Sequence, residues 1–450
     1  MNRNIQIAAA IAAILGTGAA MAGTPPTLAQ AAAGTPLYVA GSSAASKAVL
    51  GALQTNMCDG LANALNIVGS PNANFGAVSC APAAGKFTGA NGTAVFTVYY
   101  RFEGGSVTGV LPIANNDAVN QLDLSLTQFI TCADANDCTA TVNGNSATNG
   151  TGDTFTGAVS QKAVQMGISD VEPGALIGNN YPSKYSTTAW GPVNQSGVAG
   201  VPSAPLFDEV YGIYVNTGTT AGIESPLSLS TQMVANILTK GVTDWSQVTD
   251  TAGTPVSTTS IPIVIVNREA GSGSRAATDL LIAGDVCQAH GSAIAEASKN
   301  ATDYFSTGNV LSALNTQGGG ISYATIDNAP QSNETLVALN GVVPTSLAAA
   351  GGSYPFWVES VVTTNPNSVP NAALLGFVTS TLQAIATAPH LPDIMANPTV
   401  GGNVAHVNAA ANGDTATGSL TGLGSSKIYV NPFSRGKVTC NIPLEVAAVQ

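Results

Sequence analysis

The chain has 450 residues, of which only 8% are charged, and 25 acidic residues outnumber 13 basic ones. This length predicts two or three compact units. A hydrophobic content of 45% excludes a disordered polyelectrolyte. Because no basic patch with interleaved aromatic residues occurs, we expect no nucleic-acid partner.

The N-terminus has the pattern of a secretory signal peptide. Arg3 precedes an apolar run and the small-residue motif Ala20-Met21-Ala22, which predicts residues 1–22 as a cleaved signal. A membrane anchor is the alternative, but the run is shorter than the ~20 residues that span a bilayer, and no later window approaches that length. We therefore expect a periplasmic or extracellular protein with no transmembrane segment in the mature chain.

Six cysteines in an exported chain are expected to form disulfides. Proximity favours a pairing that joins Cys58 to Cys80 and Cys132 to Cys138, and leaves Cys287 for Cys440. A metal site at the Cys132 pair is the alternative, which is disfavoured because none of the three histidines is close to it in sequence. We predict neither a metal nor a cofactor.

The first half of the chain begins with a strand, a small-residue turn and a helix, in residues 35–57. Residues 94–102, "AVFTVYYRF", form a clear strand pattern that runs into the turn "EGGSVTG". From about residue 139 to residue 160 the chain consists mainly of Thr, Asn, Gly and Ser, which predicts a surface insertion without an apolar period.

The second half repeats the order of strand, turn and helix. Residues 205–218 predict a strand, and residues 227–248 predict a helix that Ser230 or Thr231 caps and Gly241 ends. The run "IPIVIVNRE", residues 261–269, predicts a strand buried on both faces, followed by a helix in "AATDLLIAG". Such repeats predict an α/β fold with parallel sheets, in which ligands bind beyond the carboxyl ends of the strands.

The stretch "REAGSGSRA" has the residue types of an anion site at such a strand end. Arg268 offers a planar fork for phosphate or carboxylate oxygens, and Ser272 and Ser274 add hydroxyl donors. The stretch lacks the Gly-Lys-Ser/Thr ending of a nucleotide P-loop and the dinucleotide G-x-G-x-x-G pattern. A flexible Gly-Ser turn without a ligand is the alternative. Arg275, on the first helical turn, is expected to face either the other side of the site or solvent.

Three other turns supply polar groups, two of them at predicted strand ends. "GSSAASKA" contributes Ser42 and Ser43, "EGGSVTG" contributes Gly105 and Ser106, and "MGISD" contributes Asp170. Helix capping or tight turns are the alternatives for each of them. Taken together, they predict a donor-rich site with one carboxylate.

The order of these motifs resembles that of the periplasmic phosphate-binding proteins of ABC phosphate uptake, over residues 36–387. The matching pieces include "YYRFEGGSVTG", and the most specific feature is the succession of "TKGVTDW" and "REAGSGSR". The resemblance implies a type 2 periplasmic-binding fold with two α/β lobes, a central ligand cleft and hinge strands near residues 208–216 and 323–330. It implies a first part of lobe I at 35–212, lobe II at 213–324, and a return to lobe I with a C-terminal tail at 325–450.

The resemblance also implies a set of ligand contacts. They are Ser42, Ser43, Ala44, Ser106, Asp170, Arg268, Ser272, Gly273 and Ser274. Trp245, Tyr323 and Trp357 lie in matching segments and are expected to pack in the core or cleft wall. The chain departs from the family at Ala270, where an acidic residue is common; here the acid is Glu269.

The function implied is capture of inorganic phosphate by an exported solute-binding protein, without chemistry on the ligand and with an ABC permease as candidate partner. Asp170 would accept the proton of a phosphate that carries one and repel sulfate, which carries none. Two alternatives stay open: an extracellular structural or adhesive protein that retains the fold, and a phosphate-ester hydrolase using Ser272 or Ser274 with Asp170.

Overall fold

The computed structural model describes residues 23–144, 155–181, 197–198, 200–219, 222–225, 227–284, 304, 306–345, 348–349, 352–365, 371–384, 403–404, 433–434 and 446–447. The predicted signal peptide and the predicted pair Cys287–Cys440 lie outside the described residues, as does most of the predicted C-terminal tail.

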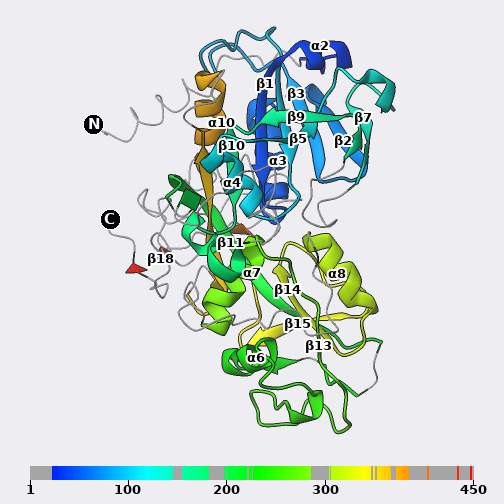
Figure 1. Ribbon diagram of the computed structural model, residues 1–450, viewed down its shortest axis with the longest axis vertical. Helices are drawn as coiled ribbons and strands as arrows, with labels where there is room; N and C mark the ends of the chain where they lie inside the picture. The colour runs from blue at the N-terminus through cyan, green and yellow to red at the C-terminus, as the bar shows by residue number, and fades with distance from the viewer. Residues whose placement is uncertain are drawn as a thin grey trace, which may run out of the picture.

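The described residues fold into two α/β lobes, lobe I above lobe II in Figure 1. The sheet of lobe I has the order β16-β10-β1-β4-β3-β2-β7-β6, and in its centre β1 pairs in parallel with both β10 and β4. The bounds of these strands are β1 Thr35–Gly41, β2 Leu65–Pro71, β3 Phe75–Cys80, β4 Phe96–Arg101, β6 Ile130–Cys132, β7 Asp137–Asn143, β10 Met166–Ser169 and β16 Trp357–Thr364. Short β8 (Thr156–Gly157) pairs with β7, and β5 (Ala118–Leu122) pairs with β9 (Val159–Ala163).

The helices of lobe I follow the sequence pattern. They are α2 (Leu28–Ala33), α3 (Ser46–Ala52) with the π-helix η1 (Leu53–Met57), α4 (Val107–Asn115) and α10 (Ala372–Ala384). Every residue of β3 and β4 is buried, and these strands contact α2, η1 and β5. The strand–turn–helix prediction for residues 35–57 and the strand prediction for 94–102 are confirmed.

The prediction of a surface insertion over residues 139–160 is wrong at both of its ends. Strand β7 buries Cys138, Ala140 and Val142 and exposes the residues between them, and β8 and the start of β9 follow residue 155. Threonine, the commonest exposed residue of β7, is a good strand former. Apolar and polar residues alternate along β7, and the polar composition of the segment hid this alternation.

Lobe II is built on a smaller set of short strands. They are β12 (Ser228–Leu229), β13 (Val264–Ile265), β14 (Gly320–Thr325) and β15 (Glu334–Leu339), accompanied by α6 (Thr231–Leu238), α7 (Gly273–Thr278) with the π-helix η8 (Asp279–Ala283), and α8 (Thr307–Thr316). Ser230 caps α6 by accepting a hydrogen bond from Met233 N at 3.0 Å, as predicted, whereas the helix ends at Leu238, before Gly241. The strand predicted over 261–269 is shorter than expected. Its start contains Pro262, which has no N–H for a ladder.

One long strand, β11 (Ser203–Asn216), belongs to both lobes (Figure 1). Its first half pairs with β16 of lobe I, and its second half pairs with β14 and β15 of lobe II. The prediction that residues 208–216 cross between the lobes is confirmed by this pairing.

The second predicted crossing, residues 323–330, is wrong. Strand β14 ends at Thr325 and the chain continues into β15, which pairs with the lobe II half of β11 and with β12. The chain is back in lobe I at β16, so lobe II extends past the predicted boundary at residue 324. The sequence between β14 and β15 has no feature that separates a connection within one lobe from a crossing between the lobes.

Buried aromatic residues fill the core around β11. Trp245, Tyr323 and Trp357 are fully buried, as predicted, and Trp245 Nε1 donates to the carbonyl of Gly319 at 2.9 Å. Helix and sheet residues of lobe II form one continuous cluster with residues of lobe I near the hinge. The core therefore joins the lobes along the strand that crosses between them.

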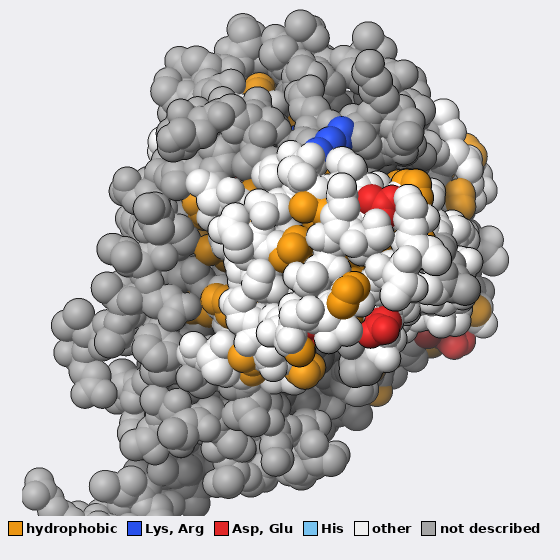
Figure 2. Space-filling model, turned by 90° about the horizontal axis from the view of Figure 1, so that it is seen from below, with side chains coloured by type: hydrophobic (Ala, Val, Ile, Leu, Met, Phe, Trp, Pro, Cys, Tyr) orange, Lys and Arg blue, Asp and Glu red, His pale blue; other side chains and the backbone are white. Residues whose placement is uncertain are grey.

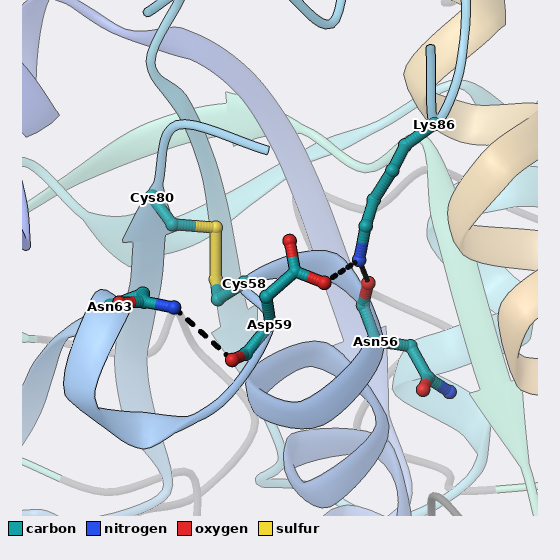
Figure 3. Close-up of polar contacts among 6 residues, drawn as sticks. All are labelled: Asn56, Cys58, Asp59, Asn63, Cys80 and Lys86. Carbon is teal, nitrogen blue, oxygen red and sulfur yellow. Dashed lines mark hydrogen bonds and ion pairs between the residues drawn. A yellow bond between two sulfur atoms is a disulfide. The ribbon is translucent and has the colours of Figure 1, made fainter. Parts of the chain in front are cut away.

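Two of the three predicted disulfides are present. Cys58 pairs with Cys80 and Cys132 pairs with Cys138. Figure 3 shows that the segment behind the first bridge is also tied by Lys86, which pairs with the Asp59 carboxylate at 2.5 Å and donates to the carbonyl of Asn56. These links fix the end of η1 against β3.

The lower face of lobe II has few charged side chains. In Figure 2 its hydrophobic side chains are scattered and Lys and Arg do not gather into a patch. Among the residues that the structure describes, no helix is long and apolar enough to cross a membrane.

Candidate functional site

The carboxyl ends of three parallel strands meet at one edge of the lobe I sheet. Gly41 at the end of β1 is in register with Ile168 of β10, and Ala40 is in register with Arg101 at the end of β4. The turns that follow therefore bring Ser42, Ser106 and Asp170 to the same edge, where open α/β sheets bind ligands.

Lobe II contributes the segment 268–274, which lies directly against these turns. The N–H of Val107 in lobe I donates to the carbonyl of Gly271 in lobe II at 2.9 Å. A Cβ at Gly273 would lie 2.2 Å from Ser106 Oγ and 2.7 Å from Asp170 Oδ2. Only glycine permits this approach, so the two lobes are in contact across the site.

Asp170 lies at the centre of the lobe I side and is 1% exposed. Its backbone N–H donates to Ser106 Oγ at 3.0 Å, and the hydroxyls of Ser42, Ser106 and Tyr211 interact with its carboxylate. Carboxylate atom Oδ1 has no hydrogen-bond partner within the described part of the chain. A buried acceptor of this kind suits a ligand that brings its own proton.

Arg268 lies at the centre of the lobe II side and is 2% exposed. Its Nε donates to the carbonyl of Tyr304 at 3.2 Å, and its Nη1 donates to Thr307 Oγ1 at 3.1 Å and to Ser274 Oγ at 3.4 Å. These bonds hold the guanidinium plane in one orientation. A fixed, desolvated guanidinium is a strong partner for an oxyanion.

A second buried carboxylate, that of Glu209, belongs to the same network. Tyr211 OH donates to Glu209 Oε2 at 3.1 Å, and Ser274 Oγ donates to Tyr211 OH at 3.4 Å. Glu209 and Tyr211 both lie on β11, the strand shared by the lobes. The network therefore runs from the hinge strand through Ser274 to Arg268.

Burial dominates the electrostatics of these groups. It raises the pKa of Asp170, against the hydrogen bond from Ser42 and the positive charge of Arg268. Burial and the nearby charge of Asp170 raise the pKa of Glu209 well above 4.5, and the same causes raise the pKa of Tyr211. Burial lowers the pKa of Arg268, an effect that Asp170 opposes. Tyr211 thus remains a hydrogen-bond donor at any physiological pH.

All nine predicted contact residues lie in or beside this cluster. Ser43 Oγ lies 3.4 Å from Thr307 Oγ1, and Ala44 contributes through its N–H, which donates to Ser42 Oγ at 3.0 Å. Ser272 Oγ accepts from Arg275 N at 3.3 Å and so caps α7. The structure brings the nine residues together but does not by itself assign them a ligand.

The alternative interpretation as helix caps is wrong for Asp170 and Ser106. The N-cap residue of the 3-10 helix after Asp170 is Glu172, and Ser106 makes no side-chain cap bond although it stands at the start of α4. Arg275 does not face solvent: it is 4% exposed and its Nη1 donates to the carbonyl of Arg268 at 3.3 Å. It therefore positions the backbone of the residue that bears the fork.

Three residues of the site were missed by the sequence reasoning: Glu209, Tyr211 and Thr307. Two acids in the otherwise apolar strand "PLFDEVYGIYV" were the available signal for the first two, because unpaired acids are rarely buried. Thr307 follows Ser306, which caps α8 by accepting from Asn309 N at 3.2 Å. That donor-rich helix start resembles the other turns of the site.

The arrangement is suited to enclosing a small tetrahedral oxyanion. It provides one fixed guanidinium, hydroxyl donors from both lobes, and a carboxylate able to accept a proton. No group of three or more His, Cys, Asp or Glu side chains that could hold a metal occurs among the residues described.

Comparison with known proteins agrees with this architecture. Residues 212–380 match the family model of the PBP superfamily domain. That segment contains the lobe II half of β11, the whole of lobe II and strand β16. No curated protein matches the chain by sequence.

Several solved structures are similar to the chain at low identity. An ABC-type phosphate transport receptor from Vibrio cholerae is 11% identical, with a TM-score of 0.41, 80% of this chain covered and 97% of the other. The phosphate-binding protein from Stenotrophomonas maltophilia is 15% identical, with a TM-score of 0.41 and coverages of 77% and 84%. A high-affinity periplasmic phosphate-binding protein, PfluDING, bound with phosphate, is 14% identical, with a TM-score of 0.43 and coverages of 90% and 98%.

Proposed function

We propose that this protein is a solute-binding protein that captures inorganic phosphate between its two lobes. The observation on which this proposal rests most directly is the meeting of Arg268 and Asp170 in one buried cluster, each supplied by a different lobe. A guanidinium alone would bind any oxyanion, but a guanidinium with a buried carboxylate favours an oxyanion that carries a proton.

Phosphate fits the two halves of this cluster in different ways. Its charged oxygens would accept hydrogen bonds from Arg268 and Ser272, and from Ser42 and Ser274 once their hydroxyls rotate away from Asp170 and Tyr211. The N–H of Gly273 is a further candidate donor. Its P–OH group would donate to Asp170 Oδ1, which has no partner among the described residues. Sulfate has no proton at neutral pH and would meet the Asp170 carboxylate as a like charge.

Binding would close the lobes around the hinge strand β11. The lobe contacts at Val107 and Gly273 are made only when segment 268–274 lies against the lobe I turns. A ligand that bridges Arg268 and Asp170 stabilises that arrangement over an open one, since it binds the closed state better.

The site supports binding without chemistry on the ligand. Ser272 already caps α7 and Ser274 donates to Tyr211, and no histidine base is near either hydroxyl in the described part of the chain. We therefore propose that the protein binds phosphate and is not an enzyme. From its predicted signal peptide, we propose that it acts in the periplasm or outside the cell. An ABC permease is the partner that would receive the captured phosphate.

Titration calorimetry of the purified, phosphate-depleted chain tests the proposal. We expect saturable binding of inorganic phosphate with a stoichiometry of one. Absence of binding at millimolar phosphate would favour the alternative of a structural or adhesive protein on the same fold. A hydrolase is tested in the same preparation with p-nitrophenyl phosphate, where turnover that Ser272→Ala abolishes would refute a pure binding role.

A further inference from the structure

A cavity of about 560 Å³ lies between the lobes beside the buried anion cluster. Its lobe I wall includes Ser43 and Ser46 of the first turn and Asn74 between β2 and β3. Its lobe II wall includes Thr307 and Asn309 at the start of α8. The volume falls within the range of about 300–1,000 Å³ that is usual for small-molecule pockets.

The cavity is lined mainly by hydroxyl and amide side chains. None of its described lining residues is charged or aromatic, and only Pro71 and Ala73 add apolar side chains. Ser, Thr and Asn side chains both donate and accept hydrogen bonds, which matches the hydroxyl groups of a polyol. A second anionic group would find no cation in this lining, and a flat base would find no ring on which to stack.

A pair of hydroxyls in the cavity wall also borders the anion cluster. Ser43 Oγ and Thr307 Oγ1 lie 3.4 Å apart, and each belongs to a different lobe. Thr307 Oγ1 also accepts the 3.1 Å hydrogen bond from Arg268 Nη1. A phosphate held by Arg268 is therefore one side-chain layer away from the cavity.

The lobe I wall is held in place by buried groups. Asn72 Nδ2 donates to Glu103 Oε2 at 2.6 Å and to the carbonyl of Gly144 at 3.0 Å. Asn72 Oδ1 accepts from the backbone and side-chain nitrogens of Asn74, at 3.2 and 3.1 Å. Because these bonds fix the turn before any ligand arrives, little ordering is needed on binding.

We propose that the cavity holds the hydroxyl-bearing part of a small phosphomonoester, such as a glycerol or sugar phosphate, whose phosphate group occupies the Arg268 cluster. The ester oxygen passes between Ser43 and Thr307, whose contact opens to admit it. This inference rests on the proposed phosphate site and extends its ligands from the free ion to polyol monoesters.

The test compares inorganic phosphate with glycerol 3-phosphate by calorimetry on the full chain. Asn309→Leu and Asn74→Leu each replace an amide of the cavity wall, and Asn236→Leu on α6 is the matched control outside it. We expect glycerol 3-phosphate to bind the wild type. Each cavity variant should weaken that binding by roughly tenfold and change phosphate binding by less than about threefold.

Three results would overturn the inference. One is a wild type that binds phosphate but not glycerol 3-phosphate, and a second is a pair of folded cavity variants that leave ester binding unchanged. A third is an equal loss of affinity for both ligands in the cavity variants, because this would indicate damage to the phosphate site. Failure of the wild type to bind phosphate at all would refute the proposed function itself. This outcome differs from the three above, in which the wild type still binds phosphate.

Discussion

Replacing Arg268 by Lys keeps the positive charge of the site but removes its planar fork. A guanidinium can give an oxyanion two parallel charge-assisted hydrogen bonds, each contributing about 1.5–3 kcal/mol, whereas an ammonium acts as a point charge. Arg268→Lys should lose about one such bond, which weakens phosphate binding by roughly 10- to 150-fold. Arg268→Ala should lose both bonds. Phosphate binding should then weaken by about 100-fold or more, which is the square of the tenfold lower limit for one bond.

Calorimetry with phosphate measures these losses, and circular dichroism melting checks that each variant is folded. Lys162→Ala is the control for net charge, because Lys162 lies on β9 and pairs with Asp123 at 3.3 Å, away from the Arg268 cluster. Its phosphate affinity should equal that of the wild type. Folded Arg268→Lys protein with an affinity within about threefold of the wild type would refute the role of the fork.

Three further substitutions probe the carboxylates and the lobe contact. Asp170→Asn replaces the proton acceptor by an amide that can also donate, so the preference for phosphate over sulfate in a competition assay should fall; an unchanged ratio would contradict it. Because burial holds the pKa of Glu209 well above 4.5, the folded state keeps a proton that the unfolded state releases, and stability should fall as pH rises above 4.5 toward the folded pKa. In urea unfolding from pH 4.5 upward, the free energy of unfolding of Glu209→Gln should decrease less with pH than that of the wild type. The same decrease in both proteins would show that Glu209 does not cause it. Gly273→Ala places a Cβ against Ser106 and Asp170, so small-angle scattering should find no compaction on adding phosphate; normal compaction would show that the lobes close in another way.

The convergence of the site was predictable because it depends on few features. Ser42 and Ser106 each follow a strand whose pattern is clear in the sequence, and parallel strands carry their following turns to one edge. Arg268 was predictable for the same reason, since it follows the apolar run of 261–267. Position after a strand was enough to place each of these side chains.

Other features depend on tertiary contacts that the sequence does not reveal. Glu209 and Tyr211 enter the site because β11 crosses between the lobes and carries them past Ser274. The return of the chain to lobe I was misplaced because β15 pairs with β11 on the side opposite β14 and so stays within lobe II. Arg275 turns inward to a backbone carbonyl, which its position on the helix did not indicate.

A crystal structure of the chain grown with phosphate tests the central claim most directly. The account predicts one phosphate between the lobes, with two of its oxygens on the Arg268 guanidinium and its P–OH group on Asp170 Oδ1. Hydroxyls of Ser42 and Ser274 should contact the same ion. A phosphate bound elsewhere, or a cleft that excludes phosphate while Arg268 and Asp170 stay in place, would contradict the claim.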